Sequence, residues 1–349
     1  MKPFKLKTIA AATAIALGVL AAPASNAALL LRSAYQDSAL AIDGWGGTAA
    51  SGTLDVNVAA GSTIQRAYLY SADVWGSGSQ GVTFGGTALT VAGGSLLVPN
   101  TNPANTVVWD VTSIVKPVVE SGPGGNYSFS IQENGNLDGE VLVVVYKNSS
   151  TAGGTAIIMD GELALAGDST HLDFASPYAS GDVFASLASS FSYNGSSTSN
   201  TTGQVTLVDV RTSSHPTDRR LTSCAGGNDD GAFVAQNGAL ITVGGTGDST
   251  ANPDPNCAGG GGDDELYNLA QGNSANAAPF LATGDTYLEL NTSNPSFDDN
   301  VFFLGLTTTF RVANVNDTDI DNGVPEPTSI TLAGLGLLGL AAARRRSTK

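Results

Sequence analysis

Short runs of β-branched and aromatic residues alternate along this chain with clusters of glycine, asparagine, serine and proline. Long stretches with an apolar residue at every third or fourth position, which amphipathic helices need, are nearly absent. Within Thr63–Ser71 the residues alternate, so that Ala67 and Leu69 face one side and Tyr68 and Tyr70 face the other. Short strands separated by turn residues are typical of sandwiches and barrels, so the sequence predicts an all-β fold.

The predicted strands fall into two blocks. The first block contains strands at 29–34, 52–58, 63–71, 81–91, 106–111, 126–133 and 141–146. The second contains strands at 155–159, 161–165, 171–174, 183–193, 204–210, 239–243, 286–291 and 301–312. Val141–Tyr146 is apolar at every position, which predicts a strand that is buried on both faces at the centre of a sheet. Two short helices are expected, at 110–116 before Pro117 and at 263–269.

The two blocks predict two packed jelly-roll-like β-sandwiches, over residues 28–149 and 150–315, with one large sandwich as the alternative. An irregular insertion at about 212–280 interrupts the second block, and an acidic linker follows at 316–323. An irregular connection of this length is unusual inside a compact domain, so it is either functional or an elaborated insertion.

Five local patterns carry a resemblance to known proteins. They are AYLYSADVWG (67–76), VTFGGTALT (82–90), VVWDVTSIV (107–115), GEVLVVVYKN (139–148) and TAIIMDG (155–161). These patterns resemble exported bacterial surface proteins with jelly-roll-like β-sandwich halves. The chemistry of that group is generally unassigned, and the matching positions are mostly core and turn positions. The resemblance therefore implies a fold and no particular activity.

The first 27 residues have the pattern of a secretory signal peptide. Lys2, Lys5 and Lys7 precede an apolar region, Ile9–Ala22. The small residues that end at Ala27 suit a signal peptidase, so we expect cleavage after Ala27. The protein that remains is expected to be exported.

The segment from Val324 to Lys349 has three parts. Pro325, Glu326 and Pro327 come first, and their prolines keep the backbone extended. An apolar stretch, 330–343, and three arginines, Arg344, Arg345 and Arg346, follow. The apolar stretch has 14 residues, whereas a permanent transmembrane helix needs about 20, so we expect only transient membrane contact through a short sorting helix.

This order of elements resembles the PEP-CTERM sorting signal of Gram-negative bacteria, which an exosortase is thought to recognise and cut. The resemblance covers only this segment, and an ordinary short tail anchor is the alternative. It implies signal peptidase and exosortase as partners during export. It also implies deposition at the cell surface or in the extracellular matrix of a Gram-negative bacterium, where biofilm formation or exopolysaccharide association is the expected context.

The charge balance excludes one class of partner. The full chain has 15 basic and 31 acidic residues. Without the signal peptide and the tail, 8 basic and 30 acidic residues remain, a net charge near −22. Such a protein repels nucleic-acid phosphates, so no nucleic-acid partner is expected. Cations and neutral glycans are compatible with this charge.

The two cysteines, Cys224 and Cys257, belong to a chain that is expected in an oxidising compartment. A disulfide between them is the natural pairing. The loop between them has almost no apolar content, and closing it would be worth roughly 3–4 kcal/mol in the chain-entropy model. A metal site is the alternative, but two thiols without neighbouring histidines do not make one.

Calcium is the best chemical hypothesis, because clustered carboxylates and backbone carbonyls supply the six to eight oxygen ligands that it needs. The candidate ligands are Asp298, Asp299, Asp229, Asp230, Asp263 and Asp264. A weaker candidate is the alternating set Asp317, Asp319 and Asp321, which lacks the glycine and glutamate of a calcium-binding loop. Solvated acidic loops explain the same residues without a metal.

Tryptophans offer a second kind of site. Trp45 and Trp75 lie in glycine-rich turn contexts and are the candidate pair for stacking on sugar rings. Trp109 lies within an apolar run and is expected in the core. Internal packing of all three tryptophans is the alternative.

Catalytic patterns are thin. The two histidines, His171 and His215, have no metal-ligand spacing, and no Gly-x-Ser-x-Gly elbow occurs. We therefore expect a non-catalytic, exported surface or matrix protein with a structural or adhesive role. One alternative is a carbohydrate-binding module, which could use Ca²⁺ as its cofactor. The other is a glycan-active hydrolase with two facing carboxylates.

Overall fold

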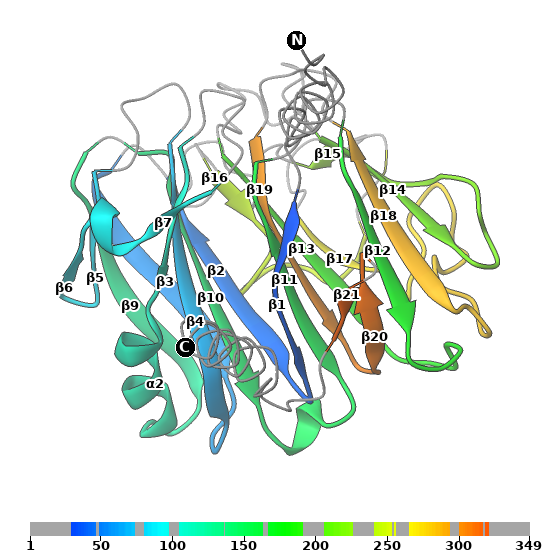
Figure 1. Ribbon diagram of the computed structural model, residues 1–349, viewed down its shortest axis with the longest axis horizontal. Helices are drawn as coiled ribbons and strands as arrows, with labels where there is room; N and C mark the ends of the chain where they lie inside the picture. The colour runs from blue at the N-terminus through cyan, green and yellow to red at the C-terminus, as the bar shows by residue number, and fades with distance from the viewer. Residues whose placement is uncertain are drawn as a thin grey trace, which may run out of the picture.

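The computed structural model describes residues 29–46, 49–73, 80–97, 105–135, 137–162, 167–190, 206–225, 241–252, 255, 265–293, 300–316 and 318–320. Within these residues the chain forms four antiparallel sheets, which stack face to face from left to right in Figure 1. We number them I to IV in the order of the stack. The predicted all-β sandwich class is confirmed. No helix of the described part is long and apolar enough to cross a membrane.

Sheets I and II form the first sandwich. Sheet I runs β3 (Ser51–Val58), β9 (Gly125–Glu133), β5 (Val82–Phe84), β6 (Thr87–Leu89). Sheet II runs β2 (Ala39–Trp45), β10 (Gly139–Lys147), β4 (Thr63–Ala72), β8 (Val107–Asp110), β7 (Ser95–Leu96). Their inner faces share one hydrophobic core, in which Phe84 stacks on Phe129 with the ring centroids 5.4 Å apart.

Sheets III and IV form the second sandwich, with its own core. Sheet III runs β1 (Leu30–Gln36), β11 (Thr155–Asp160), β19 (Asn300–Thr308), β13 (Val183–Ser190), β16 (Ile241–Val243), and β17 (Leu266–Asn268) also pairs with β13. Sheet IV runs β15 (Arg219–Ala225), β14 (Thr206–Thr212), β18 (Tyr287–Ser293), β12 (Ser169–Phe174), β20 (Val312–Val315), β21 (Thr318–Asp319).

Sheets II and III pack against each other through a third core, which we call the seam. The seam explains the continuous apolar run in β10. Val141, Val143 and Val145 point into the seam, while Leu142 and Val144 point into the first sandwich. All five side chains are fully buried, which confirms the prediction of a central strand buried on both faces.

A β-bulge in β19 enlarges the seam. Along β13, Ala188 pairs with Phe303 whereas the next residue pairs with Val301, so β19 has one extra residue here. The bulge lets two consecutive side chains, Phe302 and Phe303, face the seam. Their rings lie 6.1 and 5.4 Å from the ring of Tyr70 in sheet II.

Strand β1 lies in a different sandwich from the one that the sequence pattern predicted. The sequence assigned this strand to the first sandwich, but it pairs with β11 in sheet III, with Leu30 opposite Asp160. Periodicity identifies a strand but carries no information about a partner that lies far away in the sequence. The first sandwich is therefore built from β2 to β10.

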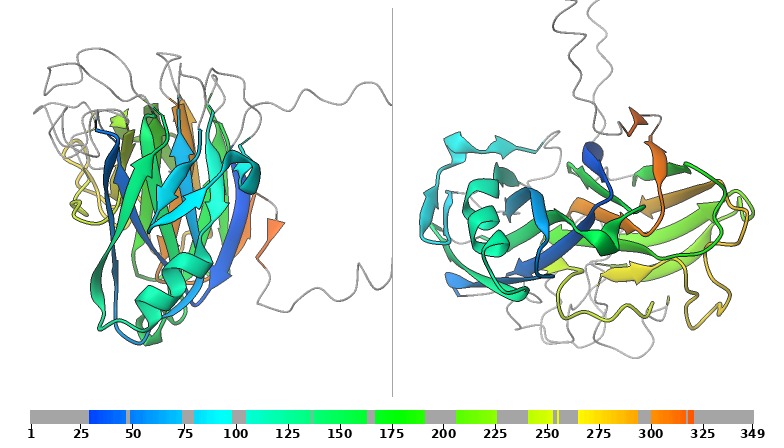
Figure 2. Two further views of the ribbon diagram at one scale, coloured as in Figure 1. Left: turned by 90° about the vertical axis from the view of Figure 1, so that its left-hand side faces the viewer. Right: turned by 90° about the horizontal axis from the view of Figure 1, so that it is seen from below.

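Helix α2 (Thr112–Glu120) lies at the lower left of Figure 1, and Figure 2 shows it from two further sides. The N-cap is Val111 and not Asp110 as the sequence predicted, although the Asp110 carboxylate accepts a hydrogen bond from the Thr112 amide at 2.9 Å in the turn that precedes the helix. The helix continues past Pro117, although the sequence predicted that it would end there. Val115 and Val119 lie in the core on either side of this proline and hold the helix in place. The second predicted helix is wrong where the structure describes it, since 266–268 is strand β17.

Candidate functional site

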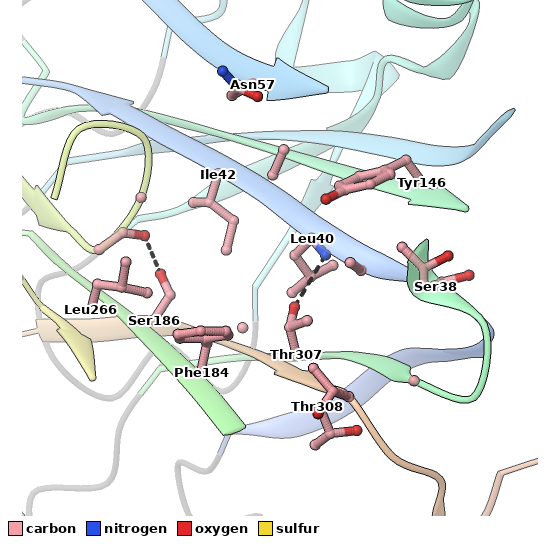
Figure 3. A pocket seen from close by; sticks show the side chains of 18 of the residues that line it. Ser38, Leu40, Ile42, Asn57, Tyr146, Phe184, Ser186, Leu266, Thr307 and Thr308 are labelled. Carbon is pink, nitrogen blue, oxygen red and sulfur yellow. Dashed lines mark hydrogen bonds between the residues drawn. The ribbon is translucent and has the colours of Figure 1, made fainter. Parts of the chain in front are cut away.

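A groove runs along the outer edge of β2, an edge strand of sheet II (Figure 3). Sheet III supplies one wall. In β13, Ala185 and Leu187 point into the second core, so Phe184 and Ser186 point the other way, into the groove. Thr307 of β19 completes this wall. We call this feature the seam groove, because it lies where the two sandwiches meet.

The opposite wall comes from the first sandwich. Asn57 lies at the end of β3 and Tyr146 lies in β10, both on the other side of β2 from Phe184 (Figure 3). The other lining residues are Ser150, Thr151, Ala152, Gly154, Gly244, Gly245, Thr246 and Thr250, which come from two further segments. The groove has a volume of about 420 Å³, which is within the range of roughly 300–1,000 Å³ for small-ligand sites.

The edge of β2 faces the groove. The Leu40 amide donates a hydrogen bond to Thr307 Oγ1 at 3.1 Å, and the Ile42 carbonyl accepts one from the Thr246 amide at 2.9 Å. These even-numbered residues therefore point their backbone groups away from β10 and toward the groove. The two threonines cap part of an edge that would otherwise pair with another strand. A compact ligand fits this arrangement better than an added β-strand does.

Gly305 makes the close approach of β2 and β19 possible. A Cβ at this position would lie 2.9 Å from Ile42 Cδ1 and 3.0 Å from Leu40 Cδ1, and 2.8 Å from the Phe303 ring. These distances are shorter than ordinary carbon contacts, so a side chain here would displace the ends of these three side chains. The glycine thus fixes the floor of the groove.

The described residues that line the seam groove are uncharged. They are serine, threonine, asparagine, glycine and aliphatic residues, with one tyrosine and one phenylalanine. Burial raises the pKa of Tyr146, so its hydroxyl stays protonated at neutral pH and both donates and accepts hydrogen bonds. The groove therefore offers hydrogen-bonding groups and apolar faces without a charge.

A charged network lies in the seam, apart from the groove. Asp160 of sheet III accepts hydrogen bonds from Arg32 of β1 and from the Tyr70 hydroxyl of sheet II, the latter at 2.8 Å. Burial raises the pKa of Asp160 in spite of these two donors, and burial also raises the pKa of Tyr70 well above its usual value. The Arg32 guanidinium also lies over the Tyr68 ring, 5.5 Å from its centroid. This network ties sheet II to sheet III and has a structural role.

Buried carboxyl groups gather at one end of the first sandwich. Glu140 is fully buried, and one of its oxygens accepts a hydrogen bond from Ser71 at 3.0 Å. Glu133 accepts a hydrogen bond from the Leu137 amide at 3.2 Å. Burial raises the pKa of Glu140 well above its usual value, and the nearby Glu133 and Asp138 add to the effect. Burial raises the pKa of Glu133 to about 7.

The protein should therefore lose stability as the pH rises from about 4.5 to about 7. In this range the unfolded chain ionises Glu133 while the folded chain keeps it protonated, so ionisation favours unfolding. We expect Glu133→Gln to flatten this part of the curve, measured as the urea midpoint against pH. A difference between wild type and variant that does not change across this range would contradict the shift.

The candidate calcium ligands lie outside the described residues. This holds for Asp298, Asp299, Asp229, Asp230, Asp263, Asp264, Asp317 and Asp321, and the side chain of Asp319 is not described either. Within the described part of the chain, no group of three or more histidine, cysteine, aspartate or glutamate residues is arranged to hold a metal. The predicted disulfide also falls outside, since Cys257 and the side chain of Cys224 are not described. Both remain predictions.

Trp45 corrects the proposed sugar-stacking pair. Its side chain is 1% exposed and lies in the core of the first sandwich, so it presents no face to a ligand. A Cβ on Gly52 would lie within 2.4 Å of the indole, which means that glycine makes room for the ring. Gly44 and Gly46, on either side of Trp45, pack closely against Val243 and Ile241, so this glycine-rich context reflects packing and not an exposed turn. Trp109 is buried as expected, and Trp75 lies outside the described residues.

The two histidines lie in sheet IV and in a nearby turn. His171 stacks on Tyr287 with ring centroids 4.9 Å apart, and its two ring nitrogens lie 3.2 Å from Asp173 and 3.6 Å from Glu289. His215 Nδ1 lies 3.1 Å from the Ser214 hydroxyl. Neither histidine lines the seam groove.

The sequence reasoning missed the seam groove. Its lining comes from many separate segments that meet only in the folded chain. The clearest local signal is the run Thr307–Thr309, which follows the apolar run of β19 and places three hydroxyl-bearing residues at the end of a core strand.

A known sorting signal matches the C-terminal segment. The model of the PEP-CTERM protein-sorting motif matches residues 323–346. The chain carries a PEP-CTERM sorting motif. The motif supports its identification as an exosortase substrate, an exported protein that is sorted to the cell surface. The match includes Pro325, Glu326, Pro327 and the three arginines, which lie outside the described residues.

The PEP-CTERM match covers the tail and none of the four sheets. A search of curated proteins finds no match to the chain. The function of the four sheets is therefore inferred from their own residues.

Proposed function

We propose that this PEP-CTERM protein has a non-catalytic, structural or adhesive role at the cell surface or in the extracellular matrix of a Gram-negative bacterium. The observation that carries the proposal is the sorting motif at 323–346. The fold supports it, because three hydrophobic cores join four sheets into one continuous stack. Deletion of the gene should change cell aggregation or biofilm formation.

A carbohydrate-binding role is the second candidate, and the uncharged seam groove favours it. Calcium dependence of such binding would rest on the aspartates named above and is tested by chelation. A glycan-active hydrolase has less support, since two facing carboxylates are needed and the described residues that line the groove include none.

The sorting role is tested by replacing Pro325, Glu326 and Pro327 with alanine. We expect the tail to remain uncleaved, because the extended triplet that the exosortase would recognise is gone. Surface protein should fall at least ten-fold while the membrane fraction gains the uncut chain. Mass spectrometry of the C-terminus and cell fractionation measure the two effects.

The matched control replaces the neighbouring Thr328 and Ser329 with alanine, which keeps the triplet, the apolar stretch and the arginines. This variant should be processed like the wild type. Normal cleavage and normal surface levels of the triplet variant would overturn the proposed sorting.

A further inference from the structure

We propose that the seam groove binds a short, uncharged saccharide. The inference deepens the proposed function and rests on it in one respect, because a protein sorted to the cell surface meets saccharides there.

The side chains that line the groove indicate the charge of the ligand. The chain has 31 acidic residues, yet no charged side chain is among the described residues that line the groove. An ionised ligand would lose hydration on entering and would gain no opposite charge in return. An anion would also be repelled by the strongly negative protein as a whole. The ligand should therefore be neutral.

The lining also indicates which hydrogen-bonding groups the ligand must carry. The hydroxyls of Ser38, Thr151, Ser186 and Thr308 are buried and already donate hydrogen bonds to backbone carbonyls. The hydroxyl side chains that a ligand can reach are the half-buried or exposed ones of the lining, Ser150, Thr246, Thr250, Thr307 and Thr309 (Thr307 is labelled in Figure 3). A hydroxyl both donates and accepts hydrogen bonds, so it matches another hydroxyl in either role. A ligand rich in hydroxyl groups satisfies more of these side chains than a hydrocarbon does.

The groove also has an apolar surface that a ligand can cover. Phe184 and Tyr146 present rings from opposite walls, with Leu40 and Ile42 between them (Figure 3). Both rings are only half-buried in the protein, so each keeps a face that a ligand can cover. Sugar rings combine hydroxyl groups at their edges with apolar C–H faces, and aromatic rings suit those faces. A neutral saccharide meets all three conditions at once.

Capping of the β2 edge argues against the main competing occupant, an extended peptide. Leu40 N–H is already bonded to Thr307, and the Ile42 carbonyl is already bonded to Thr246. A peptide that extended sheet II would have to displace both contacts. Binding of an uncharged peptide in preference to a saccharide is therefore an outcome that would overturn the proposal.

The test uses the exported protein, purified after processing, and isothermal titration calorimetry. The probes are maltotriose and cellotriose as neutral saccharides, trigalacturonate as a charged one and tetraglycine amide as a peptide. We expect measurable binding of at least one neutral trisaccharide, and binding at least ten-fold weaker for the charged saccharide and the peptide. Failure of both neutral probes, or tighter binding of either comparison probe, would overturn the proposal.

Two phenylalanine variants locate the binding. Phe184→Ala removes a ring from the groove, and Phe310→Ala removes an equally half-buried ring that packs on Phe174 and Tyr178 away from it. We expect Phe184→Ala to weaken saccharide binding at least ten-fold and Phe310→Ala to leave it within two-fold. Equal losses in both variants would contradict the assigned site.

A third variant removes a single polar atom from the groove. Thr307→Val keeps the shape of the side chain but removes the oxygen that accepts the Leu40 amide hydrogen bond. The Leu40 amide loses its acceptor, so a modest fall in the melting temperature is expected. Saccharide binding, measured well below that temperature, should be weaker, and unchanged binding would contradict the groove. These measurements do not depend on sorting, so a sorted protein that binds no saccharide would refute this inference and leave the proposed surface location intact.

Discussion

Replacement of Phe303 with alanine should lower the free energy of unfolding by about 3–5 kcal/mol, which is typical of a buried phenylalanine. The Phe303 side chain is fully buried in the seam, and its ring lies 5.4 Å from that of Tyr70 on the facing sheet. The substitution leaves a cavity between the sandwiches that surrounding strands, held by their hydrogen bonds, cannot close. Urea denaturation followed by circular dichroism measures the loss.

The control for this prediction is Val118→Ala on helix α2. This valine is 48% exposed, so its replacement should change the stability by no more than about 0.5 kcal/mol. Because the seam joins both sandwiches, Phe303→Ala should shift the unfolding of the whole described stack. A variant that leaves one sandwich at its wild-type midpoint would show that the seam does not couple them.

Replacement of Asp160 with alanine should cost about 2–3 kcal/mol, because it removes the acceptor shared by a partly buried arginine and a buried tyrosine hydroxyl. The side chain of Asp160 is 8% exposed and that of Arg32 is 24% exposed. The variant leaves the Arg32 charge and the Tyr70 hydroxyl without their shared acceptor. The free energy of unfolding, again from urea curves, checks the prediction.

An exposed ion pair provides the matched comparison. Arg211 and Asp218 are 39% and 46% exposed, and such surface pairs contribute only about 0–1 kcal/mol. Asp218→Ala should therefore have a small effect, and the Asp160 effect should exceed it clearly. Similar losses for the two aspartates would mean that the seam network is solvated and unimportant for stability.

Much of the fold could be predicted from local patterns. Alternation in Thr63–Ser71 and the continuous apolar run in 141–146 identified β4 and the central strand β10. These signals work because burial on one face or on both faces leaves a direct mark on the sequence. The pairing of β1 with β11 left no such mark, since it depends on a partner more than a hundred residues away.

The candidate site was harder to predict for a related reason. The groove depends on where sheet II ends relative to sheet III, and no single segment determines that relation. Trp45 shows the limit of local context in another way. The glycines beside Trp45 suggested an exposed turn, but they pack against strand β16 and the indole lies in the core. Sequence located the sorting signal because all of its parts lie together.

The pairing of β1 has a consequence for the order in which the exported chain can fold. A chain that emerges from its N-terminus delivers β1 first, then the whole first sandwich, and only afterwards β11, whose Asp160 pairs with Leu30. Strand β1 must therefore wait, unpaired, while residues 39–147 assemble beside it. Strand β1 stays unpaired until β11 arrives. Strand β19 then pairs with the other edge of β11. A chaperone that shields unpaired strands of exported proteins would act on this protein while β1 is unpaired, before the second sandwich exists.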